Sequence, residues 1–211
     1  FDSTGVAFDP AQQFKPQSKT VNATVTVTDQ RGRTARSNTV QIRVVRQPQA
    51  MRLDDVIFPK ANARVNNCGK RIILDELAAI INNNPDVEAV LIGHRDSGER
   101  AKAGLDRDRV LNVAAILTAG KGICANCDLS RIKVDWVGAD QTSEHRGGFC
   151  GTSTRQKTDE RKSAEISADD ESAKNRRVEI WIVPKGVAMP AAAKNPRPAP
   201  VKAVKAKGCP R

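Results

Sequence analysis

The stretch from Leu91 to Leu117 constrains the fold of this chain most strongly, because it joins a strand to a helix through a short charged loop. The apolar residues 89–92 predict a strand that leads into a loop carrying Asp96. Apolar residues recur at helical spacing from Leu105, and Arg109 falls about one turn into that helix. The sequence therefore places an acid at a strand exit and an arginine on the next helix.

Asp96 and Arg109 carry opposite charges on two rigid elements that face one loop. A carboxylate can bind an ammonium group, and the planar guanidinium can bind a carboxylate through two parallel hydrogen bonds. The pair therefore suits a ligand that carries both groups. The alternative interpretation is a surface ion pair between the two side chains, which would stabilise the fold by at most about 1 kcal/mol.

Three motifs, taken in order, resemble the OmpA-like peptidoglycan-binding domain, whose pattern is GHTD, then LSxxRAxxV, then NRRVE. The corresponding segments here are Gly93-His94-x-Asp96, Leu105-x-x-x-Arg109-x-x-x-Val113 and Asn175-Arg176-Arg177-Val178-Glu179. The resemblance covers about residues 54–184. Three ordered motifs at strand and helix spacings are more specific than any one of them alone.

The resemblance implies a non-enzymatic module that holds the peptide stem of peptidoglycan without a covalent bond or a cofactor. Asp96 would bind the ammonium group of diaminopimelate, and Arg109 its carboxylate. The implied ligand-binding residues are Asp96, Arg109, Gly93, His94, Ser97, Asn175 and Arg176. Such a module would anchor an exported protein of a Gram-negative cell envelope, on the periplasmic side of the outer membrane.

Four departures from the family pattern affect the ligand loop. Arg95 replaces the family's threonine, Asp106 its serine and Val110 its alanine, and the segment between Asp96 and Arg109 is about two residues shorter. These changes motivate an alternative function from another class. In that alternative the protein is a structural connector or adhesion module of the envelope whose altered loop has lost its ligand.

The periodicities of residues 54–184 predict the order β-α-β-α-β-(α)-β, an α/β (α+β) sandwich of helices on a mixed sheet. Asn66 or Asn67 is the expected cap of the first helix, which ends at Asn84-Pro85. The expected strands cover 55–58, 87–92, 132–137 and 178–182, and the expected helices begin near 67, 105 and 170. A long polar segment, 138–168, separates the third strand from the last helix.

The first 48 residues predict a second, all-β part. Residues 21–27 and 39–44 alternate at period two around a turn at 29–33, and together they resemble the last hairpin of an immunoglobulin-like sandwich. A two-stranded hairpin is marginal by itself, so its partner strands are expected upstream of Phe1. A linker is expected at 49–53.

The net charge of +11 lies in the two ends of the chain. Residues 51–183 contain as many basic as acidic residues, which argues against a nucleic-acid-binding core. The basic Pro/Ala-rich tail, 185–211, is expected to be an extended mobile linker, or a segment that adheres to anionic envelope polymers. No apolar run reaches the roughly 18 residues of a membrane span, so any anchor is expected upstream or on a partner.

Five cysteines fit an exported protein with one or two disulfides. Cys124 and Cys127 have the spacing of a zinc or redox motif, but a zinc site needs a second pair of ligands, and a redox motif belongs at a helix N-terminus. A disulfide from Cys124 or Cys127 to Cys150 is the preferred interpretation. No metal is therefore expected.

The remaining candidates have structural interpretations. His94 is expected to be a hydrogen-bonded loop residue and not a catalyst, because no nucleophile motif accompanies it. Arg176 and Arg177 are expected to face the ligand loop and the solvent in turn, or to pair with an acid. The acids considered are Asp170, Glu171 and Glu179. Trp181 is expected to pack under the long polar segment.

Overall fold

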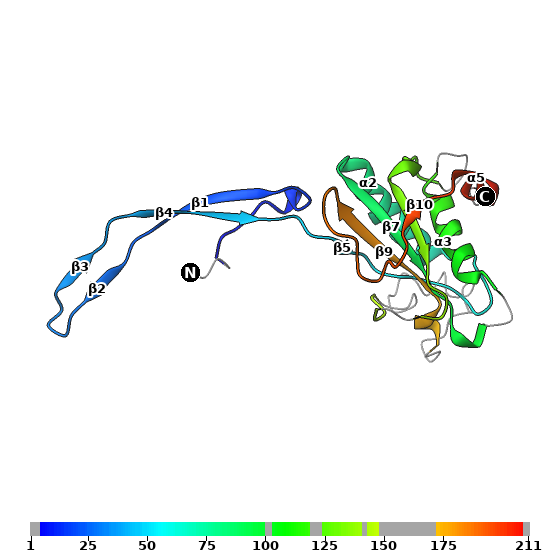
Figure 1. Cartoon of the computed structure of the whole chain (residues 1–211), viewed down its shortest axis with the longest axis horizontal. Helices are drawn as coiled ribbons and strands as arrows, with labels where there is room; N and C mark the ends of the chain where they lie inside the picture. The colour runs from blue at the N-terminus through cyan, green and yellow to red at the C-terminus, as the bar shows by residue number, and fades with distance from the viewer. Residues whose placement is uncertain (1–4, 100–102, 119–123, 141–142, 148–171, 209–211) are drawn as a thin grey trace. The chain divides into compact units, whose positions relative to one another are not determined.

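The structure is a computed structural model that describes residues 5–99, 103–118, 124–140, 143–147 and 172–208 (Figure 1). The chain divides into two compact units, Phe1–Gln49 and Ala50–Arg211. None of the helices in the described ranges combines the length and the apolar composition needed to cross a membrane.

The first unit is an antiparallel ribbon. Strand β1 (Gln17–Ala23) pairs with β4 (Val40–Arg46), and β2 (Thr26–Thr28) pairs with β3 (Thr34–Arg36), after a short 3₁₀ turn η1 (Pro10–Gln12). The predicted hairpin is therefore confirmed. The register changes by one residue between the two pairs, and the Ser37 hydroxyl accepts a hydrogen bond from Val25 N there, as expected for a bulge.

The apolar side chains of this ribbon are widely exposed within the described residues. Val25, Val27 and Val40 expose 63%, 62% and 59% of their surface. In the described part of this unit, the paired strands therefore bury little apolar surface, as expected for a lone ribbon.

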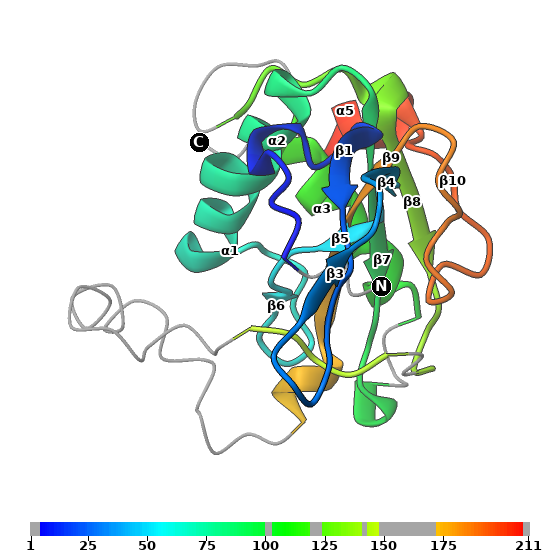
Figure 2. The same cartoon turned by 90° about the vertical axis from the view of Figure 1, so that its left-hand side faces the viewer.

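The second unit contains a mixed sheet with the strand order β10-β8-β7-β9-β5, and β6 also pairs with β9 (Figure 2). The central strand β7 runs parallel to β8 and antiparallel to β9. The bounds of these strands are β5 (Met51–Arg52), β6 (Val56–Ile57), β7 (Val87–Gly93), β8 (Ile132–Trp136), β9 (Arg177–Pro184) and β10 (Arg197–Pro198). This is an α+β domain, as predicted.

The helices begin and end close to the predicted residues. Asn66 caps the first helix by accepting a hydrogen bond from Gly69 N, and the helix continues as α1 (Asn67–Arg71), a π-helical stretch η2 (Ile72–Leu77) and α2 (Ala78–Asn83). The second helix is α3 (Leu105–Ile116), which packs on β7, β8 and β9. The short helix before β9 is a 3₁₀ turn, η5 (Ala173–Asn175). The predicted caps Asp169 and Asp170 lie outside the described residues.

The core lies between the helices and one face of the sheet. Alternation along the central strands places one set of side chains toward the helices. Its fully buried members include Ile73, Leu77, Leu91, Val113, Val134 and Ile180. On the other face a second cluster forms around Val90, Ile92, Val183 and Ala192.

The C-terminal segment was predicted to be a mobile tail, and this prediction is wrong for residues up to 208. Strand β10 pairs with β8, and helix α5 (Val201–Lys207) packs on α3 with Val204 fully buried. Ala192 belongs to the second apolar cluster. Alanine and valine spaced between the prolines supply enough apolar contact to dock this segment, despite its charge.

Candidate functional site

The predicted site residues lie around the end of β7, but only some are accessible. Ser97 is exposed, and Asp96 and Asn175 are half-buried. The fully or almost fully buried members are Gly93, His94, Arg109 and Arg176. Among the candidates, Asp96, Ser97 and Asn175 therefore reach the surface at this end of the sheet, and the others lie behind it.

Asp96 lies in the loop that leaves β7, next to the 3₁₀ turn η3 (Ser97–Glu99). Its carboxylate accepts hydrogen bonds from Gly98 N and from Asn175 Nδ2, both at 2.8 Å. The first and the third motif of the sequence thus meet at this carboxylate. These contacts orient the half-buried carboxylate, so the binding of a ligand group to it would cost little side-chain freedom.

Arg109 was predicted to lie at a partly exposed loop, but its side chain is completely buried. It pairs with Glu99 through two hydrogen bonds of 2.7 and 2.9 Å, and not with Asp96. Its other N–H groups donate to the carbonyls of Asn62, His94 and Pro59. Each of the five guanidinium N–H groups therefore has an acceptor inside the protein.

Glu99 is the functional residue that the sequence interpretation missed. Its carboxylate accepts hydrogen bonds from Ala61 N at 2.7 Å and Asp96 N at 3.0 Å, in addition to the two from Arg109. Burial raises the pKa of Glu99, but these hydrogen bonds and the Arg109 charge outweigh burial and lower it overall. The signal lay in the helix pattern, since Arg109 shares the inward stripe of Leu105 and Val113. An inward arginine requires a buried acid.

Gly93 allows α3 to approach the end of β7. A Cβ atom at this position would lie 2.2 Å from the carbonyl oxygen of Asp106 and 2.5 Å from a methyl carbon of Val110. The first glycine of the motif therefore has a packing role here, and its buried position does not present its amide to a ligand. Asp106 also orients the neighbouring loop, because its carboxylate accepts a hydrogen bond from Gly138 N.

His94 connects the Arg109 pair to a second buried polar group. Its backbone carbonyl accepts from Arg109, while its ring lies 3.0 Å from the carbonyl oxygen of Asp140 and 2.9 Å from Glu179 Oε1. The expected hydrogen bonding of this histidine is confirmed. Its ring is fully buried and does not reach the surface near Asp96.

Arg176 and Arg177 are both buried, so the prediction that one faces solvent is wrong. Arg176 donates to the carbonyl of Phe58 and to the Ser172 hydroxyl. Arg177 pairs with Glu179 at 3.0 Å and with Asp55 at 3.3 Å, which confirms one of the predicted acidic partners. The other two candidates, Asp170 and Glu171, lie outside the described residues.

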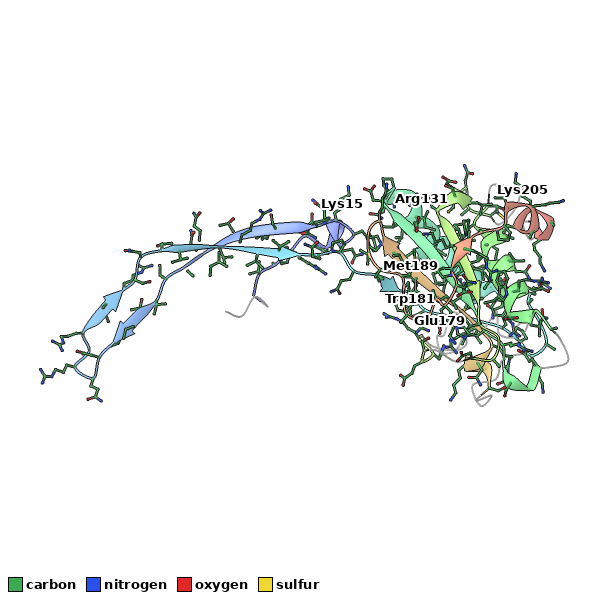
Figure 3. The ribbon with its side chains drawn as sticks, viewed as in Figure 1. Lys15, Arg131, Glu179, Trp181, Met189 and Lys205 are labelled. Atoms are coloured by element: carbon green, nitrogen blue, oxygen red, sulfur yellow. The ribbon has the colours of Figure 1, made fainter. Side chains whose placement is uncertain are left out.

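Trp181 lies on the same face of the sheet as Glu179 (Figure 3). Its indole N–H donates to Glu179 Oε2 at 3.2 Å, and Trp181, like Met189, packs against the apolar cluster around Val183 and Ala192. The predicted partner, the long polar segment, lies outside the described residues except for 138–140 and 143–147. In the described part of the chain Trp181 thus packs with the C-terminal segment.

Glu179 should make the stability of the protein sensitive to acid. Burial raises its pKa, but hydrogen bonds from His94 and Ser143 and the charges of His94 and Arg52 lower it to about 2. A carboxyl group with a lowered pKa in the folded state stabilises the protein above the pKa of the unfolded chain, near 4.5. We expect about 3 kcal/mol of stability to be lost between about pH 4.5 and pH 2, measured by urea unfolding at each pH.

The variant Glu179→Gln should flatten this pH dependence, whereas Glu144→Gln, at an exposed glutamate, should leave it unchanged. Asp55 opposes the trend in part, because burial raises its pKa despite the nearby Arg146 amide and the Arg52 and Arg177 charges. The same acid dependence in Glu179→Gln and the parent would contradict the assignment.

Of the two cysteines predicted as possible partners of Cys150, the structure rules out Cys127. Cys127 is a buried free thiol whose pKa is raised by burial, so it is not the partner of Cys150. Cys68 and Cys124 are disulfide-bonded. Cys150 lies outside the described residues, and the bridge from Cys124 to Cys150 stays a prediction. Within the described ranges no group of three His, Cys, Asp or Glu side chains could hold a metal ion.

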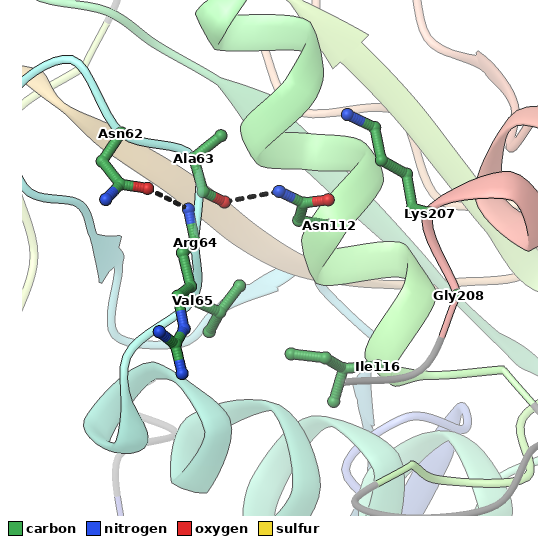
Figure 4. A pocket seen from close by; sticks show the side chains of 8 residues that line it. All are labelled: Asn62, Ala63, Arg64, Val65, Asn112, Ile116, Lys207 and Gly208. Atoms are coloured by element: carbon green, nitrogen blue, oxygen red, sulfur yellow. Dashed lines mark hydrogen bonds between the residues drawn. The ribbon is translucent and has the colours of Figure 1, made fainter. Parts of the chain in front are cut away.

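A pocket of about 310 Å³ lies on the outer side of α3 (Figure 4). The loop 62–65, two residues of α3 and the end of α5 line it, and Asn112 Nδ2 donates to the carbonyl of Ala63 across one wall. Asp96 and Arg109 are not among its lining residues. Asn62, which lines the pocket, also accepts a hydrogen bond from Arg109 through its carbonyl.

No family model matches the chain, and a search of the curated proteins finds no match either. The fold by itself defines the class of protein, an α+β domain with a mixed sheet, preceded by a β-ribbon unit. The residues that bear on function lie at the end of β7.

Proposed function

We propose that this protein is a non-enzymatic module that binds the peptide stem of peptidoglycan at the end of β7, as an OmpA-like domain does. Asp96 binds the ammonium group of diaminopimelate, and Arg109 is the partner for its carboxylate. In this proposal the protein is exported and anchors part of a Gram-negative envelope to the cell wall. The ribbon unit is the last hairpin of an immunoglobulin-like domain.

The observation that carries the proposal is the meeting of three sequence motifs at one loop. Asp96 of the first motif accepts a hydrogen bond from Asn175 of the third, and its backbone N–H donates to the acid that pairs with Arg109 of the second. Asp96 is half-buried at the surface, and its loop adjoins the carboxylate site formed by the Arg109 guanidinium. This combination suits a zwitterionic ligand.

The alternative, a structural connector that has lost its ligand, is favoured by a different observation. The guanidinium of Arg109 is fully enclosed, and all five of its N–H groups have internal acceptors. In this alternative the Glu99–Arg109 pair only stabilises the loop, and partner contacts belong to the ribbon unit and the exposed lysines of the C-terminal segment.

Replacing Asp96 by alanine should separate the two functions. Charge-assisted hydrogen bonds contribute about 1.5–3 kcal/mol, so the proposal predicts that Asp96→Ala weakens binding to purified, protein-free sacculi by one to two orders of magnitude. Loss of the contacts to Gly98 and Asn175 should lower stability by only about 1 kcal/mol. Binding is measured by co-sedimentation, with free diaminopimelate as a competitor.

Asp86→Ala is the matched control, because Asp86 is an exposed aspartate that precedes the opposite end of β7. It should bind sacculi like the parent. If Asp96→Ala also binds like the parent, or if the parent does not sediment with sacculi at all, the connector function is the better account.

A further inference from the structure

The carboxylate of Glu99 is bound by a set of four N–H donors, which is here called the carboxylate receptor. Two N–H groups of Arg109 and the backbone N–H groups of Ala61 and Asp96 all converge on its two oxygens, at 2.7 to 3.0 Å. An ionised carboxylate has about four acceptor positions, and all of them are used. Three of the four donors, two from Arg109 and one from Ala61, lie far from Glu99 in the sequence, and only the Asp96 N–H belongs to the same turn.

Glu99 belongs to a short turn at the periphery, together with the donor Asp96, whereas the donors Ala61 and Arg109 lie on other parts of the chain. It ends the 3₁₀ turn η3, which has only three residues, and the two preceding residues, Ser97 and Gly98, are exposed. Arg109 lies instead on the twelve-residue helix α3, between the sheet and the loop 59–62. Rotation of the Glu99 side chain can therefore vacate the receptor while all four donors stay in place.

We propose that Glu99 is an internal stand-in for a ligand carboxylate, and that such a carboxylate reaches Arg109 only by exchanging with Glu99. The identity of that ligand as the peptide stem rests on the function proposed above. The exchange replaces one carboxylate by another, so the four hydrogen bonds are kept and no buried donor is left unpaired. Glu99 then sets the affinity of the site as an intramolecular competitor.

The neighbouring Asp96 explains how an external ligand could compete. Its N–H donates to Glu99, and its half-buried carboxylate faces Asn175 at the surface. A ligand with both an ammonium and a carboxylate group gains the Asp96 contact, which Glu99 cannot make. The receptor thus selects zwitterionic ligands over simple carboxylates.

Removing the competing side chain tests the receptor without any peptidoglycan. Glu99→Ala deletes a fragment equivalent to acetate, so it should melt below the parent and regain about 2–4 °C in saturating sodium acetate. Sodium chloride at the same ionic strength should have no such effect. Glu99→Gln is the matched control, since its amide fills the receptor and acetate should not stabilise it. If Glu99→Ala does not fold in chloride, the yield of folded protein on refolding in acetate replaces the melt.

The second measurement compares the affinities of the parent and Glu99→Ala for a stem peptide. An intramolecular competitor acts at an effective concentration of millimolar or more, so Glu99→Ala should bind a diaminopimelate-containing stem peptide about tenfold more tightly than the parent. In the parent, the same peptide should shift the NMR resonance of Arg109 Nε–H.

The outcomes separate the two proposals. Rescue by acetate without peptide binding by either protein would overturn the proposed function and leave the carboxylate receptor standing. Sacculus binding by the parent that Glu99→Ala does not improve, together with no acetate rescue, would overturn the exchange and leave the proposed function standing through Asp96.

Discussion

Replacing Arg109 by alanine should lower the free energy of unfolding by about 3–5 kcal/mol, because it leaves the buried Glu99 carboxylate without its charged partner. This expectation differs from that for an exposed ligand-binding arginine, whose loss would scarcely change stability. Arg109→Lys should be intermediate, since an ammonium group keeps the charge but cannot form two parallel hydrogen bonds. Urea unfolding measures the difference.

Arg107→Ala is the matched control for this experiment. Arg107 lies on the same helix and carries the same charge, but its side chain is 54% exposed and its nearest acid, Asp108, is 3.8 Å away. Its loss should change stability by less than about 1 kcal/mol. The double variant Arg109→Ala/Glu99→Ala should lose less than the sum of the single variants, because no buried charge remains unpaired. Equal melts for Arg109→Ala and Arg107→Ala would contradict the internal pairing.

Introducing an acid on the buried side of α5 should lower stability by about 3 kcal/mol or more. Val204 is fully buried where α5 packs on α3, so Val204→Asp places an unpaired carboxyl group in an apolar contact. Thermal and urea unfolding of the whole chain are the measurements.

Val201→Asp, three residues earlier on the same helix, provides the comparison. Val201 is 47% exposed and lies at the helix N-terminus, where an acid is tolerated, so its substitution should stay within about 0.5 kcal/mol of the parent. A C-terminal segment that is mobile in solution would make both variants behave like the parent, which would restore the original expectation for this segment.

The order of strands and helices could be predicted because it depends on local patterns. Period-two alternation indicated β1, β4, β8 and β9. Helical spacing indicated α3, and helical spacing together with an Asn cap indicated the helix that starts at Asn67. The short pairings β5 and β10 were not predicted, because they lie in segments with the composition of a linker and a tail and form only through their partner strands.

The docking of the C-terminal segment was not predicted for the same reason, because it also depends on partners elsewhere in the fold. Its lysines and prolines are typical of a solvated linker, but Val204 and Ala192 find apolar partners that lie far away in the sequence. Composition gives the residue types of a segment, but its burial depends on whether the rest of the fold provides an apolar surface for it to pack against.

The sequence by itself determined the α+β class, the position of Asp96 at a strand exit and the position of Arg109 on the following helix. Only the tertiary structure decided that Arg109 is buried and pairs with Glu99, while Asp96 stays at the surface with Asn175. The physical reason is that a charged side chain pairs with the opposite charge that is nearest in space, whatever their separation in the sequence. The turn η3 brings Glu99 within 2.7 Å of the guanidinium, and no spacing along the chain specifies that approach.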